Sequence, residues 1–311
     1  MSIFSNPFFY ASADAAYVPT TKGIIAFGHF ADGSNTNLSN LISSSGVVSS
    51  DVTGVGTATR GRAACTYGGD KGIYCFGVTA SARVTTINLV SNSGVVASDS
   101  SGAGTATNGG AACSYGVGKG IKAYGFTTSA LNESNLISDT GGMAASITLV
   151  GTARWALSGV AYGSDKGIYA YGSNQGSTYY NMSNLVSNVG VISTDVTGVG
   201  TARHQPGSCT YGTETAIFAF GYNGSRLGMS NLVSSSGVIA SDVAAVGTAR
   251  HSPAGVGYGS DKGIFAFGSH AGGTYTNLSN LVSSSGVIAT DTTGVGTARA
   301  VILQGAGYST A

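Results

Sequence analysis

A repeat of 47 to 49 residues that recurs six times is the feature that most constrains this chain. The best-preserved copy runs from Tyr258 to Arg299 and reads YGSDKGIFAFGSHAGGTYTNLSNLVSSSGVIATDTTGVGTAR. Each copy contains a phrase that resembles KGI. These phrases begin at Lys22, Lys71, Lys119, Lys166, Thr215 and Lys262. Because the copies cover nearly all of the 311 residues, one domain built from equivalent units is favoured over several unrelated domains.

Four strand-like phrases alternate with turns inside each repeat. The first is small and apolar, as in Ala63 to Gly68, and a Gly-Gly-Asp or Gly-Ser-Asp turn joins it to the KGI phrase. The KGI phrase is apolar on both alternating faces, which is typical of a strand packed between neighbours. The third and fourth phrases, such as Asn277 to Gly286 and Gly286 to Gly294, alternate less strictly and are expected to be outer strands.

A period of roughly 40 to 50 residues with short strands and turns is typical of a β-propeller, in which each repeat forms one blade. The sequence therefore predicts an all-β fold, a six-bladed β-propeller with four antiparallel strands per blade, over residues 22–311. Residues 1–21 precede the first full repeat and are interpreted as an N-terminal arm or a closing segment.

The chain is poor in charge, which limits its possible partners. Only 9% of the residues are charged and the formal net charge is +1, so no basic surface for a phosphate backbone is expected and nucleic acid is excluded as a partner. No apolar stretch reaches the roughly 20 residues that a membrane helix needs, so no membrane insertion is expected. Asn6 and Pro7 interrupt the N-terminal apolar run, which disfavours a signal peptide.

The cysteines and histidines do not form a recognisable metal motif. The four cysteines lack CxxC spacing and are not joined by histidines at zinc-ligand intervals, so no metal and no cofactor are expected. Cys65 and Cys75 flank a turn symmetrically. They are interpreted either as a disulfide across a hairpin or as two free thiols packed as small apolar side chains.

Catalytic motifs are also missing from the sequence, which predicts a protein that is not an enzyme. The string from Gly116 to Gly120 has neither the spacing nor the hydroxyl of a mononucleotide-binding loop. The four histidines belong to no Ser/His/Asp arrangement. One aspartate per repeat, as at Asp195 and Asp242, is interpreted as an Asx-type turn rather than as a metal ligand. The sequons recur only because the NLSNL phrase recurs, so they give no independent support for glycosylation.

The order of these phrases resembles a kelch-type propeller: a basic residue, a small apolar strand, a tight turn, a strand that ends in aromatic-Gly, and two outer strands. The resemblance covers nearly the whole chain. Kelch blades carry a Gly-Gly pair where this chain has an aromatic-Gly pair such as Phe267-Gly268. The near-identical copies, rich in Ser, Thr and Gly, are also similar in texture to repeat-rich propeller proteins of tailed bacteriophage virions.

The kelch resemblance implies that the chain ends close the ring. The last 12 residues contain a first-strand phrase that no KGI phrase follows, whereas the first copy begins directly at Lys22. Residues 302–308 are therefore expected to supply the innermost strand of the first blade. The alternative is a closing strand at Ala15 to Tyr17, which resembles the end of a first-strand phrase.

The loops on one side of the ring vary, while the turns on the other side are nearly uniform. Two segments of each repeat are expected to share the variable side: the loop after the second strand and the segment around the Thr-Ala-Arg phrase that closes the repeat. Binding residues usually lie on such loops. The alternative is that these loops are free of any constraint. The predicted interaction face comprises Arg154, Trp155, Arg203, His204, Arg250, His251 and Arg299 near the axis, with Tyr179, Tyr180, Tyr222, Arg226, His270 and Tyr275 farther out.

Arginine and aromatic side chains often anchor interfaces, and aromatic faces also stack on sugars. A competing structural role is open for the arginines, in which each pins the carbonyls of the next blade. The N-terminal arm is predicted to be an attachment segment through Phe4, Phe8, Phe9 and Tyr10.

The sequence thus favours a non-enzymatic structural or interaction protein, and the phage resemblance implies a virion component in capsid decoration, baseplate or tail fibre. Its expected partners are other virion or assembly proteins, through the arm, and a host-surface glycan or receptor. The alternative is a free, lectin-like carbohydrate-binding propeller that is extracellular or at a cell surface.

Overall fold

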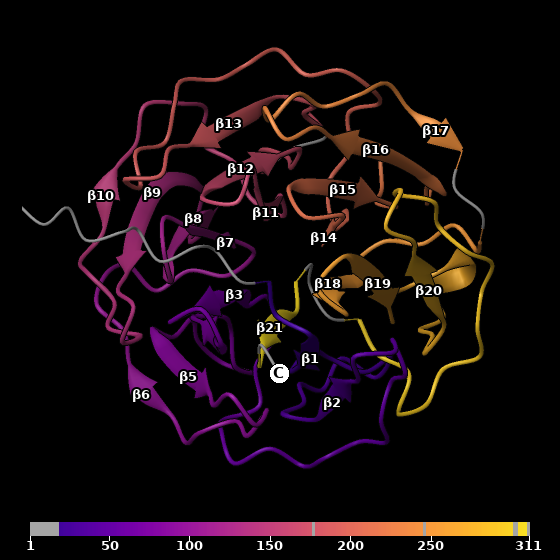
Figure 1. Ribbon diagram of the computed structural model, residues 1–311. Helices are drawn as coiled ribbons and strands as arrows, with labels where there is room; N and C mark the ends of the chain where they lie inside the picture. Colours follow the sequence, from indigo (N-terminus) through magenta and orange to yellow (C-terminus); the bar gives the residue numbers. More distant parts are fainter. Residues whose placement is uncertain (1–18, 176–177, 245–246, 301–303, 310–311) are drawn as a thin grey trace, which may run out of the picture.

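The computed structural model describes residues 19–175, 178–244, 247–300 and 304–309. These residues form an all-β fold of six antiparallel sheets without an α-helix, and a single 3-10 turn, η1 (Ala271–Gly273), lies in the last repeat. Figure 1 shows the sheets arranged in a ring, one after another in chain order. The predicted all-β class with six sheet-forming repeats is confirmed, and the described residues contain no helix long and apolar enough to cross a membrane.

The first three sheets follow the first three repeats. The first sheet contains β2 (Ser39–Ile42), β1 (Lys22–Ala26) and β21 (Ala306–Tyr308), with β1 in the middle. The second contains β3 (Ala63–Tyr67), β4 (Lys71–Cys75), β5 (Thr86–Val90) and β6 (Ser100–Ser101). The third contains β7 (Ala111–Tyr115), β8 (Lys119–Phe126), β9 (Ala130–Ile137) and β10 (Ile147–Thr148).

The last three sheets repeat this arrangement. The fourth contains β11 (Ser158–Tyr162), β12 (Lys166–Ala170) and β13 (Ser183–Val186). The fifth contains β14 (Gly207–Tyr211), β15 (Thr215–Ala219), β16 (Met229–Val233) and β17 (Val243–Ala244). The sixth contains β18 (Ala254–Tyr258), β19 (Lys262–Ala266) and β20 (Ser279–Val282).

The fourth strand is shorter than the sequence predicts. Three sheets have a fourth strand of two residues, and in the other three the outer segment makes only isolated bridges, such as Ser183 with Val196 and Val186 with Ile192. Ile192 is buried, but Val191 beside it is 63% exposed. A segment that buries so few apolar side chains gains little from extended pairing.

Neighbouring sheets pack closely, which explains the glycine in the KGI phrase. A Cβ atom on Gly167 would lie 2.3 Å from Sγ of Cys113, and one on Gly263 would lie 2.4 Å from Sγ of Cys209. A side chain on either glycine would therefore displace a thiol of the preceding sheet. The cysteine thus acts as a small core residue.

The proposed disulfide is wrong, because the hairpin register separates its two cysteines. Cys65 lies opposite Ile73, and Cys75 lies opposite Ala63. All four cysteines are free and buried.

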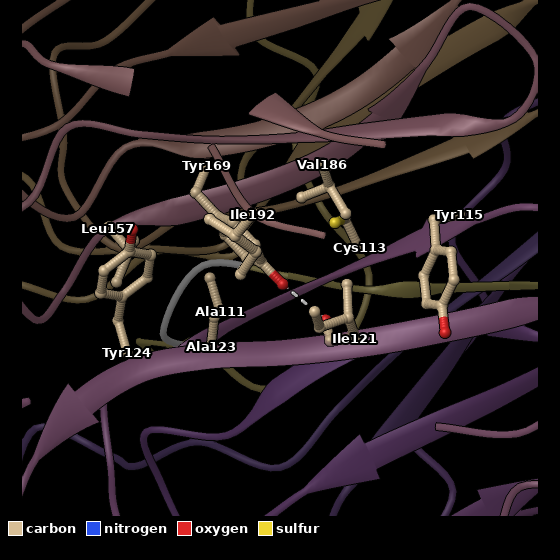
Figure 2. Close-up of a cluster of buried hydrophobic side chains, with 10 residues drawn as sticks. All are labelled: Ala111, Cys113, Tyr115, Ile121, Ala123, Tyr124, Leu157, Tyr169, Val186 and Ile192. Carbon is tan, nitrogen blue, oxygen red and sulfur yellow. Dashed lines mark hydrogen bonds between the residues drawn. The ribbon is translucent and has the colours of Figure 1, made fainter. Parts of the chain in front are cut away.

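The apolar core is divided into clusters that each span two adjacent sheets. Figure 2 shows the cluster between the third and fourth sheets, in which Tyr124 and Ile121 face Tyr169 and Leu157. The rings of Tyr124 and Tyr169 meet edge to face at 5.6 Å, and the hydroxyl of Tyr169 donates a hydrogen bond to the carbonyl of Ile121 at 2.6 Å. Tyr169 thus buries the face of its ring and also satisfies its polar end.

An aromatic residue with a left-handed backbone conformation lies at the end of the second strand of each repeat. The φ angles lie between 59° and 67° for Phe27, Phe76, Tyr124, Tyr171, Phe220 and Phe267. For a bulky residue this conformation costs about 1–2 kcal/mol, so something must offset the cost six times. The offset is a cation over each ring: the guanidinium carbon of Arg203, for example, lies 3.9 Å from the ring centroid of Tyr171.

Four arginines of the predicted interaction face are buried between neighbouring sheets. We call each such contact between two sheets a junction. Arg154, Arg203, Arg250 and Arg299 have no exposed surface. Their guanidinium groups stack on the aromatic residue of one sheet and donate to an asparagine of the next, as Arg203 does to Oδ1 of Asn231 at 2.7 Å. Arg250 Nε also donates to the carbonyl of Phe267 at 3.0 Å, in the sheet that follows it. The structural alternative, in which the arginine binds the next sheet, is therefore the correct one.

The single aspartate of each repeat completes this junction. Asp242 accepts hydrogen bonds from the backbone nitrogen and the hydroxyl of Thr201, and its second oxygen accepts from Asn231. Arg203 lies 3.8 Å from the same carboxylate. Burial raises the pKa of Asp242, but the bonds from Thr201 and Asn231 together outweigh it and lower the pKa. The predicted Asx-type turn is wrong, because the donors Thr201 and Asn231 lie 41 and 11 residues away in the sequence.

In the first two repeats a threonine, Thr59 or Thr107, follows Thr-Ala in place of the arginine. In both cases a cation from another position lies over the aromatic ring. At the second sheet, Arg62 places its guanidinium 4.2 Å from the ring of Phe27 and donates to Asn88. At the third sheet, Lys122 lies 4.9 Å from the ring of Phe76. Ser146 stands there in place of the aspartate and accepts from the backbone nitrogen of Thr105. Burial lowers the pKa of Lys122 to about 8.

The chain ends meet in the first sheet, as predicted. β21 pairs antiparallel with β1, with Lys22 opposite Tyr308 and Ile24 opposite Ala306, and Figure 1 shows this pair near the centre of the ring. The alternative closing segment, Ala15 to Tyr17, lies outside the described residues.

A glutamine just before β21 adds a second link at the centre. The side-chain amide of Gln304 accepts hydrogen bonds from the backbone nitrogens of Ala64 and Ala112 and donates to the carbonyls of Ala112 and Gly159. One side chain therefore satisfies inner strands of three sheets, β3, β7 and β11.

Deletion of residues 300–311 should abolish cooperative unfolding, because it removes both β21 and Gln304. Deletion of residues 1–12, which lie outside the described part of the chain, should leave the melting temperature nearly unchanged. Circular dichroism melts of both truncations test this expectation. A stable, cooperative 1–299 fragment would contradict it.

Replacement of Arg250 by Met should lower the free energy of unfolding by about 3 kcal/mol, because Asn280 and Asp291 lose their buried partner. Replacement of Lys122 by Met should change it by less than about 1 kcal/mol, because no ion pair with a carboxylate is broken there and the methionine fills the same space. Urea denaturation of the two variants measures the difference. Equal losses would contradict the assignment of the arginine junction as the stabilising network.

Candidate functional site

The variable loops and the TAR segments meet on one side of the ring, as the sequence predicts. Each repeat closes with Thr-Ala-Arg or Thr-Ala-Thr. The residue after this phrase forms a backbone bridge with a residue of the loop that follows the second strand, as His204 does with Tyr222 and Trp155 with Ser173. A third residue from the same loop extends most of these pairs, such as Tyr179 beside Ser173. Three side chains per repeat are thereby placed on this side.

Aromatic and imidazole rings from successive repeats form a continuous band on the variable side. Trp155 and His204 lie 6.5 Å apart between ring centroids, Tyr179 and His204 5.0 Å, His204 and Tyr222 5.5 Å, and Tyr222 and His251 5.7 Å. Phe126 extends the band from the third sheet, 5.1 Å from Trp155. We call this set the aromatic arc: Phe126, Trp155, Tyr179, His204, Tyr222 and His251.

The members of the aromatic arc are half-buried, so each keeps part of its ring accessible. Trp155 donates from Nε1 to the carbonyl of Asn174 at 3.1 Å, which fixes the indole. Next to the arc, the hydroxyl of Tyr275 lies 3.0 Å from Nε2 of His29. The backbone bridge between Arg226 and Tyr222 places this arginine beside the arc.

Three histidines on this side are held neutral. Burial lowers the pKa of His204 to about 4. Burial also lowers the pKa of His251 to about 4, with smaller contributions from Arg226, His204 and His29. The pKa of His29 falls to about 4 through burial and the charge of Arg60, although a hydrogen bond with Ala300 opposes the shift. At neutral pH these imidazoles therefore carry hydrogen-bonding groups but no charge.

Several polar atoms on this side have no partner among the described residues. They include Nδ1 of His204 and Nε of Arg226, both of them nearly inaccessible to solvent. Buried polar atoms are nearly always satisfied by protein, water or ligand. The unpaired atoms therefore mark places where a bound group can supply the missing partner.

The structure divides the predicted site residues into three groups. It gathers Trp155, Tyr179, His204, Tyr222 and His251 into the aromatic arc, with Arg226 and Tyr275 next to it. Tyr180 and His270 lie outside the arc and are held by backbone bonds to Gly172 and Thr274. The four TAR arginines are buried at the sheet junctions. The arm residues Phe4, Phe8, Phe9 and Tyr10 lie outside the described residues.

The sequence reasoning missed four residues on this side: His29, Arg60, Arg83 and Phe126. Phe126 and His29 occupy the repeat position of Tyr222, Arg60 occupies that of His204, and Arg83 occupies that of Tyr179. Arg83 stacks 5.0 Å over the ring of Phe126. Superposition of the six repeats position by position would have found all four.

A cavity of about 100 Å³ lies on the axis, toward the side with the KGI turns. Its wall carries small and hydroxyl side chains of the inner strands, such as Thr66, Ser114 and Thr210, and Gln304 also borders it. Cys65, Cys113 and Cys209 line it too, but burial raises the pKa of each thiol, that of Cys113 to about 12. Protonated thiols are poor nucleophiles and poor metal ligands.

No group of three or more His, Cys, Asp or Glu side chains that could hold a metal ion occurs in the described ranges. The sequon asparagines are occupied structurally. Asn277, for instance, donates from Nδ2 to the carbonyls of Gly294 and Gly296 at 3.0 and 2.9 Å. This bond explains why the asparagine recurs in the NLSNL phrase.

Comparison with known proteins finds no family model and no curated protein that matches this chain.

The neutral histidines predict a pH dependence of stability. A histidine with an unfolded pKa of 6.5 and a folded pKa of about 4 binds a proton more readily when unfolded. Its stabilising contribution is complete above pH 6.5 and is lost as the pH falls from 6.5 to 4. We expect the melting temperature to fall over this interval, and His204→Gln to fall less than the wild type. A melting temperature that stays flat between pH 7 and 4.5 would contradict the burial of these imidazoles.

Proposed function

We propose that this chain is a six-bladed, kelch-like β-propeller. The proposal is supported by six sheets in chain order around a ring, by one sheet per repeat, and by the pairing of β21 with β1, which joins the two ends of the chain. The aromatic-Gly pair takes the position at which kelch blades carry Gly-Gly, and both of its residues have positive φ angles, as at Phe267 and Gly268.

We further propose a non-enzymatic structural or interaction role, with the aromatic arc as the contact surface. The observation that carries this proposal is the gathering of aromatic side chains from four consecutive sheets on the only variable side of a rigid ring. Aromatic side chains are enriched among residues that dominate interface energies. The junction aspartates are hydrogen-bonded to threonine and asparagine, so they are occupied by the scaffold rather than poised for acid-base chemistry.

The setting that we favour is a tailed-phage virion, in capsid decoration, baseplate or tail fibre. This part of the proposal rests on the texture of the repeats. A charge-poor ring with the arginines between its sheets buried suits it, because salt screens interactions between buried charges only weakly.

The two sides of the ring suggest how such a module is attached. Thr20 lines the axial cavity together with Gly69, Gly116 and Gly118 of the hairpin turns, so the described chain begins on the side with the KGI turns. The aromatic arc lies on the other side. We propose that residues 1–18, which include Phe4, Phe8, Phe9 and Tyr10, attach the protein to the particle and leave the arc free for an outer partner.

Carbohydrate binding outside a virion is a second candidate function. The aromatic arc favours it, because aromatic faces stack on the apolar faces of sugar rings. The three side-chain positions of each repeat carry different residues, so one asymmetric site is expected rather than six equal sites.

The double variant Trp155→Ala and Tyr222→Ala tests the contact surface. Incorporated into particles, it should leave assembly and the melting temperature nearly unchanged but lower adsorption to host cells at least tenfold. His270→Ala, outside the arc on the same side, serves as the control and should adsorb like the wild type. Particles purified from a producing host should contain the protein at a fixed copy number. Its absence from particles would refute the virion setting, and unchanged adsorption would remove the arc as the contact surface.

A further inference from the structure

We infer that the aromatic arc and Arg226 form one binding site for an acidic oligosaccharide, a glycan that carries carboxylate or sulfate groups. This inference deepens the interaction role proposed above and rests on it. It adds the chemical class of the ligand and assigns the charged group to one arginine.

The shape of the arc fits a chain of sugars better than a compact ligand. Its rings follow one another from Phe126 to His251 at centroid distances of 5.0 to 6.5 Å. The principal cavity in the described residues lies elsewhere, on the axis. Peptide partners usually anchor side chains in pockets, whereas sugar rings can lie flat on aromatic platforms.

The polar groups within the arc match the hydroxyl groups of sugars. The neutral imidazole of His204 leaves Nδ1 without a partner in the described parts of the chain, and the rings of Tyr179 and Tyr222 contact both this imidazole and each other. A neutral imidazole offers one donor and one acceptor, and a phenol offers both functions. Sugar hydroxyls also act as donor and acceptor, so the two sets are complementary.

The charge on this side favours an anion. Arg60, Arg83 and Arg226 bring three positive charges, whereas His29, His204 and His251 are neutral. Asp32, the carboxylate in the first variable loop, accepts bonds from Ser34 and is fully exposed. Glu133, in the segment that follows the second strand of the third repeat, has a buried Oε2 without a partner among the described residues. The three arginines therefore face two carboxylates, and this excess of positive charge recruits negatively charged ligands.

Arg226 is the arginine whose hydrogen-bonding capacity is open. Arg60 already donates to Oδ1 of Asn35 at 2.9 Å, and Arg83 Nε donates to Oδ1 of Asn108 at 2.8 Å. Nε of Arg226 has no partner in the described residues and is almost inaccessible to solvent, so a ligand must reach this guanidinium through its terminal nitrogens. A planar guanidinium binds carboxylate or sulfate with paired hydrogen bonds. Arg226 is therefore the residue that selects an acidic sugar.

The experiment uses the full chain on an array that holds sialylated, uronic-acid and sulfated oligosaccharides, each printed beside its neutral counterpart. We expect binding to members of the acidic set and at least tenfold weaker binding to the matched neutral glycans. Arg226→Gln should weaken the best acidic glycan about ten- to a hundredfold, because a hydrogen bond to a charged group contributes about 1.5–3 kcal/mol. Lys166→Gln, which removes one charge from the opposite side, is the matched control and should bind normally.

The results distinguish the failure of the acidic ligand from the failure of the aromatic arc as a contact surface. Equal binding to acidic and neutral glycans, or an unchanged affinity of Arg226→Gln, overturns the acidic ligand. If the arc variant still loses host adsorption in that case, the interaction surface stands without it. If no glycan binds and the arc variant adsorbs normally, both the ligand class and the contact surface are rejected.

Discussion

The stacking of a buried cation on an aromatic ring is the interaction on which the rest of the ring depends. Each second strand ends in an aromatic residue with a positive φ angle, a conformation that a glycine would adopt without strain. The aromatic ring is retained because it supports the cation, which in turn holds the asparagine of the next sheet, as in the set Phe220, Arg250 and Asn280. A local backbone cost is thereby exchanged for a contact between sheets. Guanidinium suits this place because it stacks by its face and donates hydrogen bonds by its edge.

The third junction shows that these residues act as a unit. There a lysine replaces the arginine and a serine replaces the aspartate, so that the positive and the negative group change together. Lys122 takes the strand position that an aromatic residue holds in other repeats, such as Tyr169, and reaches the neighbouring ring from there. An aspartate at this junction would have no guanidinium to approach it. The repeats of one chain can thus be compared with each other. In the third repeat the lysine and the serine replace the arginine and the aspartate together.

The sequence was sufficient to predict the strands, turns and loops of each repeat. It was insufficient to predict the direction in which individual side chains point. The hairpin of β11 and β12 and the variable side could be predicted, because turn residues and strand patterns fix them locally. The pairing of β21 with β1 is not local, and it was predicted from the kelch resemblance and from a last first-strand phrase that no KGI phrase follows. The burial of Arg154 could not, since a charged residue beside a loop reads the same whether it points outward or between two sheets. Arg62 replaces the missing arginine from three positions along the chain, which no alignment of the repeats by position reveals. In the site, the arc was recognised only in part. Phe126 was missed because it was read only as the first residue of a variable loop and not as the equivalent of Tyr222.

The pairing of Lys22 with Tyr308 also determines when this protein can finish folding during its synthesis. β1 and β2 of the first sheet leave the ribosome before the other five repeats, whereas its inner strand and Gln304 follow those repeats. Until then, β1 has an open edge on the axis, and exposed strand edges pair readily with other chains. Five repeats must therefore pack against each other before the first can be completed. The long delay between the two halves of one sheet gives a nascent chain an interval in which exchange of the last strand with a neighbouring copy competes with correct closure.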